Sequence, residues 1–530
     1  MKNRMHAAVN LAGIPFGVPA GVIAAVSASI LASSASADVF SDIRYNDLVA
    51  RLGAAVPTGA GIGVMQCEAP ETGSNYAPDT TLPEFVGKTF TMQSGTFPSS
   101  WHASEVGRAL YGANTSVAPG VPSIFVWNVN SWLGSAYLRV GSGSLTAPVV
   151  APAGVRVMNH SWIGSYGNTS FDNEALRRLD FLIVRDNMFV SAGVNNGAGS
   201  LAYSLMAYSY NGLAVGLDTG AHSNSVAPAG IDGQGRRKPD IVAPGAFTSF
   251  GTPVVGAVAA LLWDTADSDP AVASNANAFK ALTLKSVIMA GATHPAGWSN
   301  GAPTSGASRG ITATPLDTVK GVGVVNADRA HMILTAGERD GLAAPSASTF
   351  SPSRGWDWIA APASGSTTYH SFRLYQGVGE VSVIAAWNRN VPSGYTSFSV
   401  MDVDLKLKKW VDGVATEISG DGGAAVFGGG NCVSASTVDN AEHLYLTNLS
   451  AGDYLLEITR KAGTQATMPV VVSWYMPNTV RPGDLNGDGT VGAPDLALLL
   501  GQWGVAGSAD LNGDGVVGAP DLSLLLGNWG

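Results

Sequence analysis

A serine stands at the start of a strongly apolar segment, an arrangement that can support nucleophilic chemistry. Ser249 is followed by a run of small and apolar residues over 251–262, which is typical of a buried helix. The N-terminus of a helix carries partial positive charge and N–H groups without an intrahelical partner, and together these can hold an oxyanion. A serine at this place can also be a simple helix N-cap, so the serine alone leaves both interpretations open.

Two motifs lie around this serine: residues 238–245 read Lys-Pro-Asp-Ile-Val-Ala-Pro-Gly, and residues 248–255 read Thr-Ser-Phe-Gly-Thr-Pro-Val-Val. They resemble the signature around the nucleophile of the subtilases, the subtilisin-like serine peptidases. Residues 101–107, Trp-His-Ala-Ser-Glu-Val-Gly, are similar to the motif in which the family's histidine opens a helix. The resemblance implies that Ser249 is the nucleophile and His102 the general base; the alternative for His102 is a partly exposed histidine at a helix start. In such chemistry the imidazole accepts the proton of the serine hydroxyl.

Two further segments between these motifs carry the same resemblance. Val-Met-Asn-His-Ser, which ends at Ser161, is similar to the strand that holds the substrate backbone, and this implies that Ser161 and Gly164 bind substrate. Ser-Ala-Gly-Val-Asn-Asn-Gly is similar to the segment that supplies an amide donor to the oxyanion. It implies Asn195 as that donor, with Asn196 as the second choice because the segment has an apparent one-residue insertion.

The acidic partner of the imidazole is where this sequence departs from the family. The first strand of subtilases ends with an aspartate, and Gln66 occupies that place here. Because side chains alternate faces along a strand, Gln66 and Glu68 point the same way, about 7 Å apart along the backbone. Glu68 is therefore one candidate for the acid that orients His102. The alternative is an ordinary loop carboxylate, which leaves a site reduced to Ser249 and His102.

The order of apolar segments predicts a multidomain fold. Residues 38–341 alternate short apolar runs with helix-like stretches, which indicates a subtilisin-like α/β domain with a mostly parallel sheet. We expect strands over 61–65, 155–159, 188–192 and 212–216, and helices over 104–111, 174–185, 253–264 and 276–290. Residues 345–476 have sheet-like spacing without helix signals, which predicts an antiparallel β-sandwich. Its expected strands are 381–387, 403–410, 443–449, 454–459 and 469–474.

The start of the chain predicts export. Lys2 and Arg4 precede a short apolar stretch that closes with Ala35-Ser36-Ala37, so residues 1–37 are interpreted as a secretory signal peptide. We expect a secreted protein, extracellular or attached to the cell surface, with no transmembrane span. The net charge is -10 and no run of Lys or Arg offers a footprint for nucleic acid, which argues against nucleic acid as a partner.

The last residues, 483–530, follow a linker at 477–482 and contain a duplication. Residues 484–504 recur almost unchanged at 510–530. Each copy has oxygen-bearing side chains at loop positions 1, 3, 5 and 12 and a backbone carbonyl at position 7, a spacing that suits Ca²⁺. The expected ligands are Asp484, Asn486, Asp488, Thr490 and Asp495 in the first loop, and Asp510, Asn512, Asp514, Val516 and Asp521 in the second.

This duplication resembles dockerin modules, which have two calcium loops, each followed by one helix. The resemblance implies a small helical module that binds Ca²⁺ and a cohesin-like domain. Positions 10 and 11 of both loops are Ala-Pro, unlike the Ser-Thr pair of cellulosomal dockerins. The alternative is a calcium-stapled cap without a partner, because a core this small needs a metal.

Two functions from different classes remain open. The first is a secreted serine endopeptidase that hydrolyses peptide or protein substrates and is tethered by the C-terminal module. The second is a catalytically silent surface protein for adhesion or scaffolding. Gln66 favours the second, as does the short segment 38–60, which cannot hold a folded propeptide. Cys67 and Cys432 either pair or stay free, because their spacing does not decide between these states.

Overall fold

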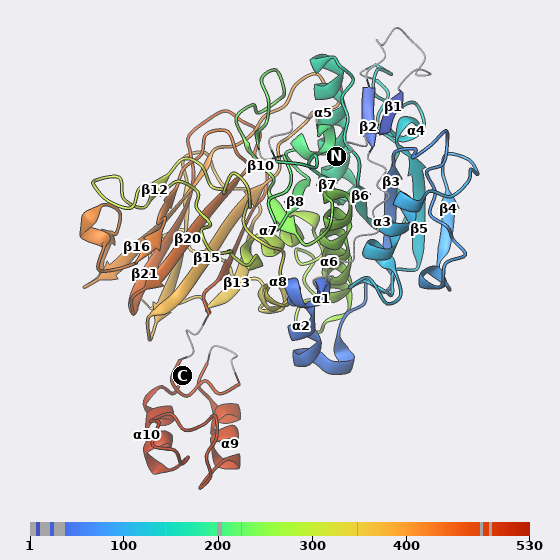
Figure 1. Cartoon of the computed structure of the whole chain (residues 1–530). Helices are drawn as coiled ribbons and strands as arrows, with labels where there is room; N and C mark the ends of the chain where they lie inside the picture. Colours follow the sequence, from blue (N-terminus) through green and yellow to red (C-terminus); the bar gives the residue numbers. More distant parts are fainter. Residues whose placement is uncertain are drawn as a thin grey trace.

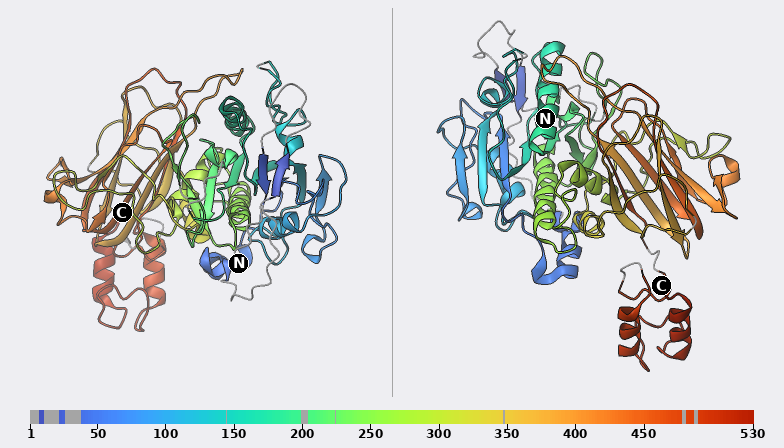
Figure 2. Two further views of the ribbon diagram at one scale, coloured as in Figure 1. Left: turned by 45° about the horizontal axis from the view of Figure 1, so that its top comes forward. Right: turned by 180° about the vertical axis from the view of Figure 1, so that it is seen from behind.

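The chain folds into an α/β domain, a β-sandwich and a small pair of helices (Figures 1 and 2). The computed structural model describes residues 7–10, 22–25, 38–143, 145–198, 204–223, 225–346, 348–477, 481–486 and 490–530. Of the expected signal peptide it describes only strands β1 (Ala7–Asn10) and β2 (Val22–Ala25), which pair with each other, so that prediction falls largely outside the described residues. None of the described helices has the length and apolar character needed to cross a membrane.

A parallel sheet forms the centre of the α/β domain. In the described part of the chain it has seven strands in the order β11-β8-β7-β6-β3-β5-β4, and every pairing is parallel. The strands are β3 (Gly63–Glu68), β4 (Thr89–Met92), β5 (Ser123–Asn128), β6 (Val155–His160), β7 (Phe189–Gly193), β8 (Leu213–Leu217) and β11 (Ile241–Ala243). Helices cover both faces, so the central strands β3, β6 and β7 are buried along nearly their whole length. The predicted parallel sheet is confirmed.

The helices of this domain pack around α6 (Thr248–Ser268), which is buried along most of its length. The small residues predicted to bury this helix let it approach the sheet: a Cβ on Gly256 would lie 2.9 Å from Leu110 of α3 and 3.2 Å from Ser191 of β7. The other helices are α1 (Val39–Asp42), α2 (Tyr45–Leu52), α3 (Trp101–Tyr111), α4 (Val129–Leu133), α5 (Thr169–Asp186), α7 (Ala281–Gly291) and α8 (Ala327–Thr335). A short hairpin of β9 (Ser225–Val226) and β10 (Arg237–Lys238) lies outside the main sheet.

Two antiparallel sheets form the sandwich, as predicted. The first has the order β12-β19-β16-β21-β14 with β17 on β16, and the second has the order β13-β22-β15-β20-β18. Their strands are β13 (Arg354–Ile359), β14 (Thr367–Leu374), β15 (Val378–Trp387), β16 (Val403–Val411), β17 (Val414–Glu417), β18 (Gly429–Gly430), β19 (Val433–Ser434), β20 (Ala441–Leu449), β21 (Gly452–Arg460) and β22 (Val470–Tyr475). The edge strand β12 (Ile311–Thr312) comes from the stretch before residue 341 and pairs in parallel with β19. The sheet of the sandwich is therefore completed by a segment assigned to the preceding domain.

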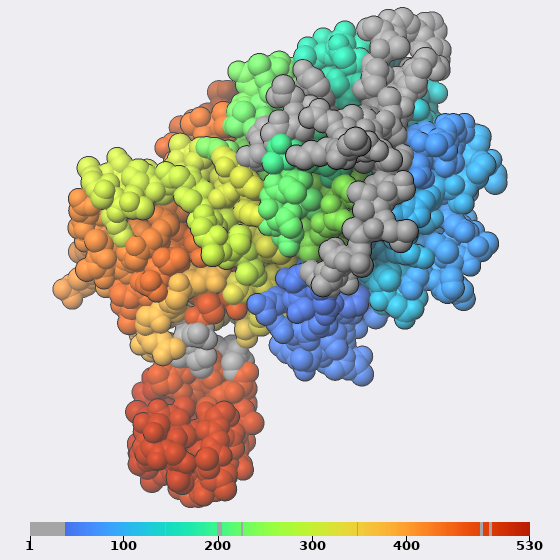
Figure 3. All heavy atoms as spheres, in the orientation of Figure 1, coloured from blue at the N-terminus to red at the C-terminus, as the bar shows by residue number. Residues whose placement is uncertain are grey.

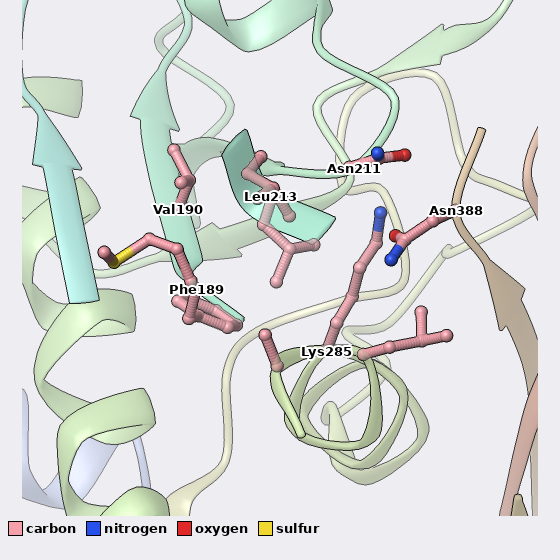
Figure 4. A pocket seen from close by; sticks show the side chains of 10 residues that line it. Phe189, Val190, Asn211, Leu213, Lys285 and Asn388 are labelled. Atoms are coloured by element: carbon pink, nitrogen blue, oxygen red, sulfur yellow. The ribbon is translucent and has the colours of Figure 1, made fainter. Parts of the chain in front are cut away.

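The α/β domain and the sandwich share a continuous core. Residues of α7 such as Leu284 and Ile288 belong to the same buried apolar cluster as Ile384 and Val471 of the sandwich. Between α7 and the sheet, Lys285 extends toward Asn211 and Asn388 (Figure 4). Its amino group donates to two backbone carbonyls at 2.8 and 3.1 Å, and the cavity there, about 10 Å³, has room for about one water molecule. The two parts therefore form one folded body.

The C-terminal residues form a separate lobe beneath the sandwich (Figure 3). Helices α9 (Ala493–Gly501) and α10 (Ala519–Gly527) each follow one of the two loops, as the sequence predicts. Their core is a cluster of five buried side chains among the described residues: Val491, Leu499, Ala509, Val517 and Leu525. Residues 478–480 of the expected linker and the expected ligand Asp488 lie outside the described residues.

Candidate active site

The carboxyl ends of the central strands bring the predicted site residues to one edge of the sheet. Glu68 is the last residue of β3, Ser161 directly follows β6, and Asn195 follows β7. These three strands are neighbours and parallel, so their ends meet at the same edge. His102 and Ser249 are each the second residue of a helix, α3 and α6 respectively, and these helices pack against each other.

His102 is hydrogen-bonded to Glu68. The distance between His102 Nδ1 and Glu68 Oε2 is 2.9 Å, and both residues are buried, with relative exposures of 7% and 0%. Burial acts to lower the pKa of His102, but the charge and hydrogen bond of Glu68, together with the charge of Glu71, outweigh it. The pKa of His102 is therefore raised above its ordinary value. Glu68 thus occupies the position from which an acid orients an imidazole.

Strand β3 holds Glu68 on the same face as Gln66, as the alternation of side chains predicts. Gln66 Nε2 donates to Glu68 Oε1 at 3.0 Å and to the backbone carbonyl of Ala103 at 2.8 Å. Cys67, between them, points to the opposite face and packs in the second core cluster of the domain. Cys67 and Cys432 are both buried and free, so the structure decides against their pairing.

Ser249 lies in the first turn of α6 rather than at its N-cap, which is Phe247. The backbone carbonyl of Ser249 accepts a hydrogen bond from Ser161 Oγ at 2.9 Å. The ring of the next residue, Phe250, lies 5.8 Å from the ring of His102, measured between centroids. This contact places the start of α6 beside the imidazole, and the N-cap interpretation of Ser249 does not hold.

Asn196 provides the cap that the start of α6 otherwise lacks. Its Oδ1 accepts from the backbone N–H of Thr248 at 2.8 Å and from Thr248 Oγ1 at 2.9 Å. Asn195, the first choice of the sequence analysis, is buried, and its backbone N–H donates to Ser204 Oγ at 3.0 Å. Of the two amides, the structure gives that of Asn196 a direct bond to the residue that precedes Ser249.

The two residues expected to bind substrate have different surroundings. Ser161 is buried, and its hydroxyl accepts from Asn159 Nδ2 at 2.9 Å in addition to its bond with the carbonyl of Ser249. The backbone carbonyl of Gly164 accepts from the N–H of Leu205 at 3.2 Å. Ser161 therefore contacts the backbone of Ser249, while substrate contacts of either residue stay a prediction.

Sequence reasoning missed a buried polar chain that ends at the backbone of Ser249. Ser191 of β7 donates to Asn159 of β6 at 3.3 Å, and Asn159 in turn donates to Ser161. Tyr111 was also missed; its hydroxyl donates to Gln66 Oε1 at 2.6 Å. The available signal was the presence of polar residues inside otherwise apolar strands, because buried polar groups almost always have hydrogen-bond partners.

In each duplicated loop, the aspartate at position 12 is hydrogen-bonded to the backbone of its own loop. Asp495 and Asp521, at position 12 of each loop, accept hydrogen bonds from backbone N–H groups at both ends of their own loop. In the second loop Asp510 accepts from three further N–H groups, while Asn512 donates to Asp514. Both loops are therefore closed by an aspartate at position 12, and the carboxylate and amide oxygens of the expected ligands have the donor chemistry that fits a calcium ion.

A cleft of about 850 Å³ lies away from these residues, between the sandwich and the C-terminal lobe. Arginines predominate among its charged residues: Arg51, Arg339, Arg354, Arg373 and Arg481 line it together with Asp484. It includes none of the residues at the edge of the parallel sheet, so it is separate from the candidate active site.

Comparison with known proteins matches residues 92–310 to the model of the Subtilase family. This part of the chain is a subtilase domain, and because the matched range begins after β3, it does not include Glu68. Among solved structures, the chain is similar to one in the crystal structure of the complex of Aeromonas sobria serine protease with its chaperone. The identity is 13% and the TM-score 0.36, with 79% of this chain and 88% of that chain covered. No curated protein matches this sequence.

Proposed function

We propose that this protein is a secreted serine endopeptidase in which Glu68 replaces the usual aspartate. The observation that carries the proposal is the 2.9 Å contact between Glu68 and His102, next to the helix that begins at Ser249. Because Glu68 accepts the Nδ1 proton, the imidazole presents Nε2 as the acceptor for the hydroxyl proton of Ser249. A buried carboxylate also stabilises the imidazolium that forms when the proton is transferred.

The attack of Ser249 on a peptide carbonyl generates a negative oxygen that needs donors. The start of α6 supplies its partial positive charge, and an asparagine amide supplies a hydrogen-bond donor. We assign that amide to Asn196, because its Oδ1 is held by Thr248 at 2.8 Å, which fixes the direction of its side chain. His102 then returns the proton to the leaving amine, and water releases the acyl group from Ser249.

We also propose that the C-terminal module binds two Ca²⁺ ions and docks to a cohesin-like domain. Residues 483–530 contain six aspartates and no Lys or Arg, so bound cations would offset a concentrated negative charge. Each copy exposes matching apolar side chains, Leu500 and Trp503 in the first and Leu526 and Trp529 in the second. Exposed apolar patches of this kind are typical of protein docking surfaces. Binding of the calcium-loaded chain to an immobilised cohesin domain, compared with Trp503→Ala, tests this tether.

A fluorophosphonate probe tests the peptidase directly, because it reacts with an activated serine irrespective of substrate sequence. We expect labelling of the calcium-loaded wild type, loss of labelling in Ser249→Ala, and loss in His102→Ala. The exposed Ser348 provides a matched control, and Ser348→Ala should label like the wild type. A folded wild type that the probe does not label would reject the peptidase and favour a catalytically silent adhesion or scaffolding protein.

A further inference from the structure

A buried chain of hydrogen bonds extends from the candidate base into the domain. Tyr111 Oη donates to Gln66 Oε1, Gln66 Nε2 donates to Glu68 Oε1, and Glu68 Oε2 faces His102 Nδ1. The donor–acceptor distances are 2.6, 3.0 and 2.9 Å. Tyr111, Gln66 and Glu68 each have a relative exposure of 0%. Bulk water therefore does not reach Tyr111, Gln66 or Glu68.

The orientation of the Gln66 amide is fixed by two independent contacts. Its oxygen accepts from Tyr111, and its nitrogen donates at 2.8 Å to the backbone carbonyl of Ala103, which can only accept. A flipped amide would place oxygen against the Ala103 carbonyl and nitrogen against the tyrosine hydroxyl. The amide therefore always presents an N–H group to position 68, and whatever stands at position 68 must accept it.

We propose that Gln66 is a positioning residue. Its N–H group requires the residue at position 68 to accept a hydrogen bond with one oxygen, and this directs the other oxygen of Glu68 to His102. This inference rests on the proposed function, because it assigns the tautomer of the proposed base. Glu68 meets the requirement with two acceptor oxygens, one for Gln66 and one for the Nδ1 proton. His102 is thereby held with Nε2 unprotonated, as a base toward Ser249 requires.

The fixed amide makes a sharp prediction for Glu68→Gln. The new amide must turn its oxygen to Gln66, so its NH₂ group faces His102 Nδ1. That nitrogen must then accept, the ring proton moves to Nε2, and the imidazole can no longer take a proton from Ser249. We expect a loss of kcat of about 10⁴-fold, the size of effect that a wrong histidine tautomer causes.

Replacing Gln66 by methionine should lower activity in the wild type but raise it in the Glu68→Gln variant. In the wild type, Gln66→Met removes a donor to a buried carboxylate, and we expect kcat/KM to fall roughly tenfold to a hundredfold. In Glu68→Gln, the same change frees the amide at 68 to turn its oxygen to His102, and we expect kcat to rise about tenfold or more above the single variant. Equal losses in both backgrounds would overturn the proposal.

A second readout does not depend on activity. In ¹⁵N-histidine-labelled protein carrying Ser249→Ala, NMR reports which ring nitrogen of His102 bears the proton, and the His102→Ala spectrum identifies its signals. We expect the proton on Nδ1 in the parent, on Nε2 after Glu68→Gln, and on Nδ1 again after Gln66→Met is added. Tyr111→Phe, a milder change, should keep the proton on Nδ1 and lower kcat/KM less than Gln66→Met.

The two readouts separate the two hypotheses. If the tautomers follow this pattern while the wild type hydrolyses no peptide, the proposed function fails and the role of Gln66 stands. If the wild type is active and the proton stays on Nδ1 in Glu68→Gln, the role of Gln66 is rejected and the peptidase stands.

Discussion

Asn196 caps α6, and we propose that its amide is also the oxyanion donor; one substitution can separate these two roles. Its Oδ1 accepts from the N–H and the hydroxyl of Thr248 at 2.8 and 2.9 Å and so caps α6. In Asn196→Asp, a carboxylate oxygen accepts the same two bonds. A negative charge at a helix N-terminus contributes about 0.3–1 kcal/mol, so we expect stability toward thermal unfolding to be unchanged or slightly higher. The capping role is therefore preserved.

Catalysis should respond in the opposite direction. Asn196→Asp removes the Nδ2 donor and places a charge near the oxygen that becomes negative in the transition state. The loss of one such donor costs about 2.7–4 kcal/mol, which corresponds to a fall in kcat of about 10²–10³-fold. We expect KM to change little, because the donor acts mainly on the transition state.

The assay is steady-state hydrolysis of a chromogenic peptide, with thermal unfolding measured on the same samples. Asn195→Ala is the matched control, since its side chain is the alternative donor. Near wild-type turnover in Asn196→Asp together with a large loss in Asn195→Ala would refute the assignment and return the role to Asn195. A parallel loss of stability and activity in Asn196→Asp would instead show that the cap, and not the donor, is what the substitution disturbs.

Three further changes test other parts of the molecule. Chelation of calcium should make residues 481–530 sensitive to protease, reversibly on adding Ca²⁺, because the five-residue core of the module is too small to fold alone; equal digestion with and without chelator would contradict the calcium sites. Arg389→Met should cost about 3–5 kcal/mol in urea unfolding, because it removes the ion partner of the buried Asp180 and leaves Asp232 paired with Arg177 alone. Burial lowers the pKa of both His294 and His443 at the domain interface, so their contribution to stability is present above the ordinary histidine pKa, about 6.5, and is lost as the pH falls below it. The phenylalanine of His443→Phe cannot take up a proton. When urea unfolding is measured at neutral pH and at pH 5, we expect this variant to lose less stability at the lower pH than the wild type does.

The elements that follow from local patterning were predictable from the sequence. The apolar runs predicted strands at 155–159 and 188–192, and the structure has β6 and β7 within one residue of these bounds. The small residues after Ser249 predicted a buried helix, and α6 is buried through most of its turns. These predictions succeeded because a buried strand or helix between two layers leaves its own signal in its residues.

Features that depend on distant partners were not predictable. The cap on α6 comes from Asn196, about fifty residues upstream, and no local pattern at Ser249 indicates it. The pairing of β12 with β19 was not predictable either, because a segment of two residues is too short to be recognised as a strand. The choice between Asn195 and Asn196 also depended on an apparent insertion in a loop, where side-chain direction is not set by a regular period.

The position of Glu68 opposite His102 shows how far along a strand a carboxylate can move and still face the imidazole. Side chains repeat their face every two residues, so a carboxylate can move from position 66 to position 68 and still face α3. A shift to position 67 would have turned it into the opposite core, where Cys67 packs. The two-residue shift carries the carboxylate along the strand, and the longer glutamate side chain reaches back to the imidazole while Gln66 occupies the space left behind. Strand geometry therefore identifies Glu68 as a candidate where alignment by position finds only a glutamine.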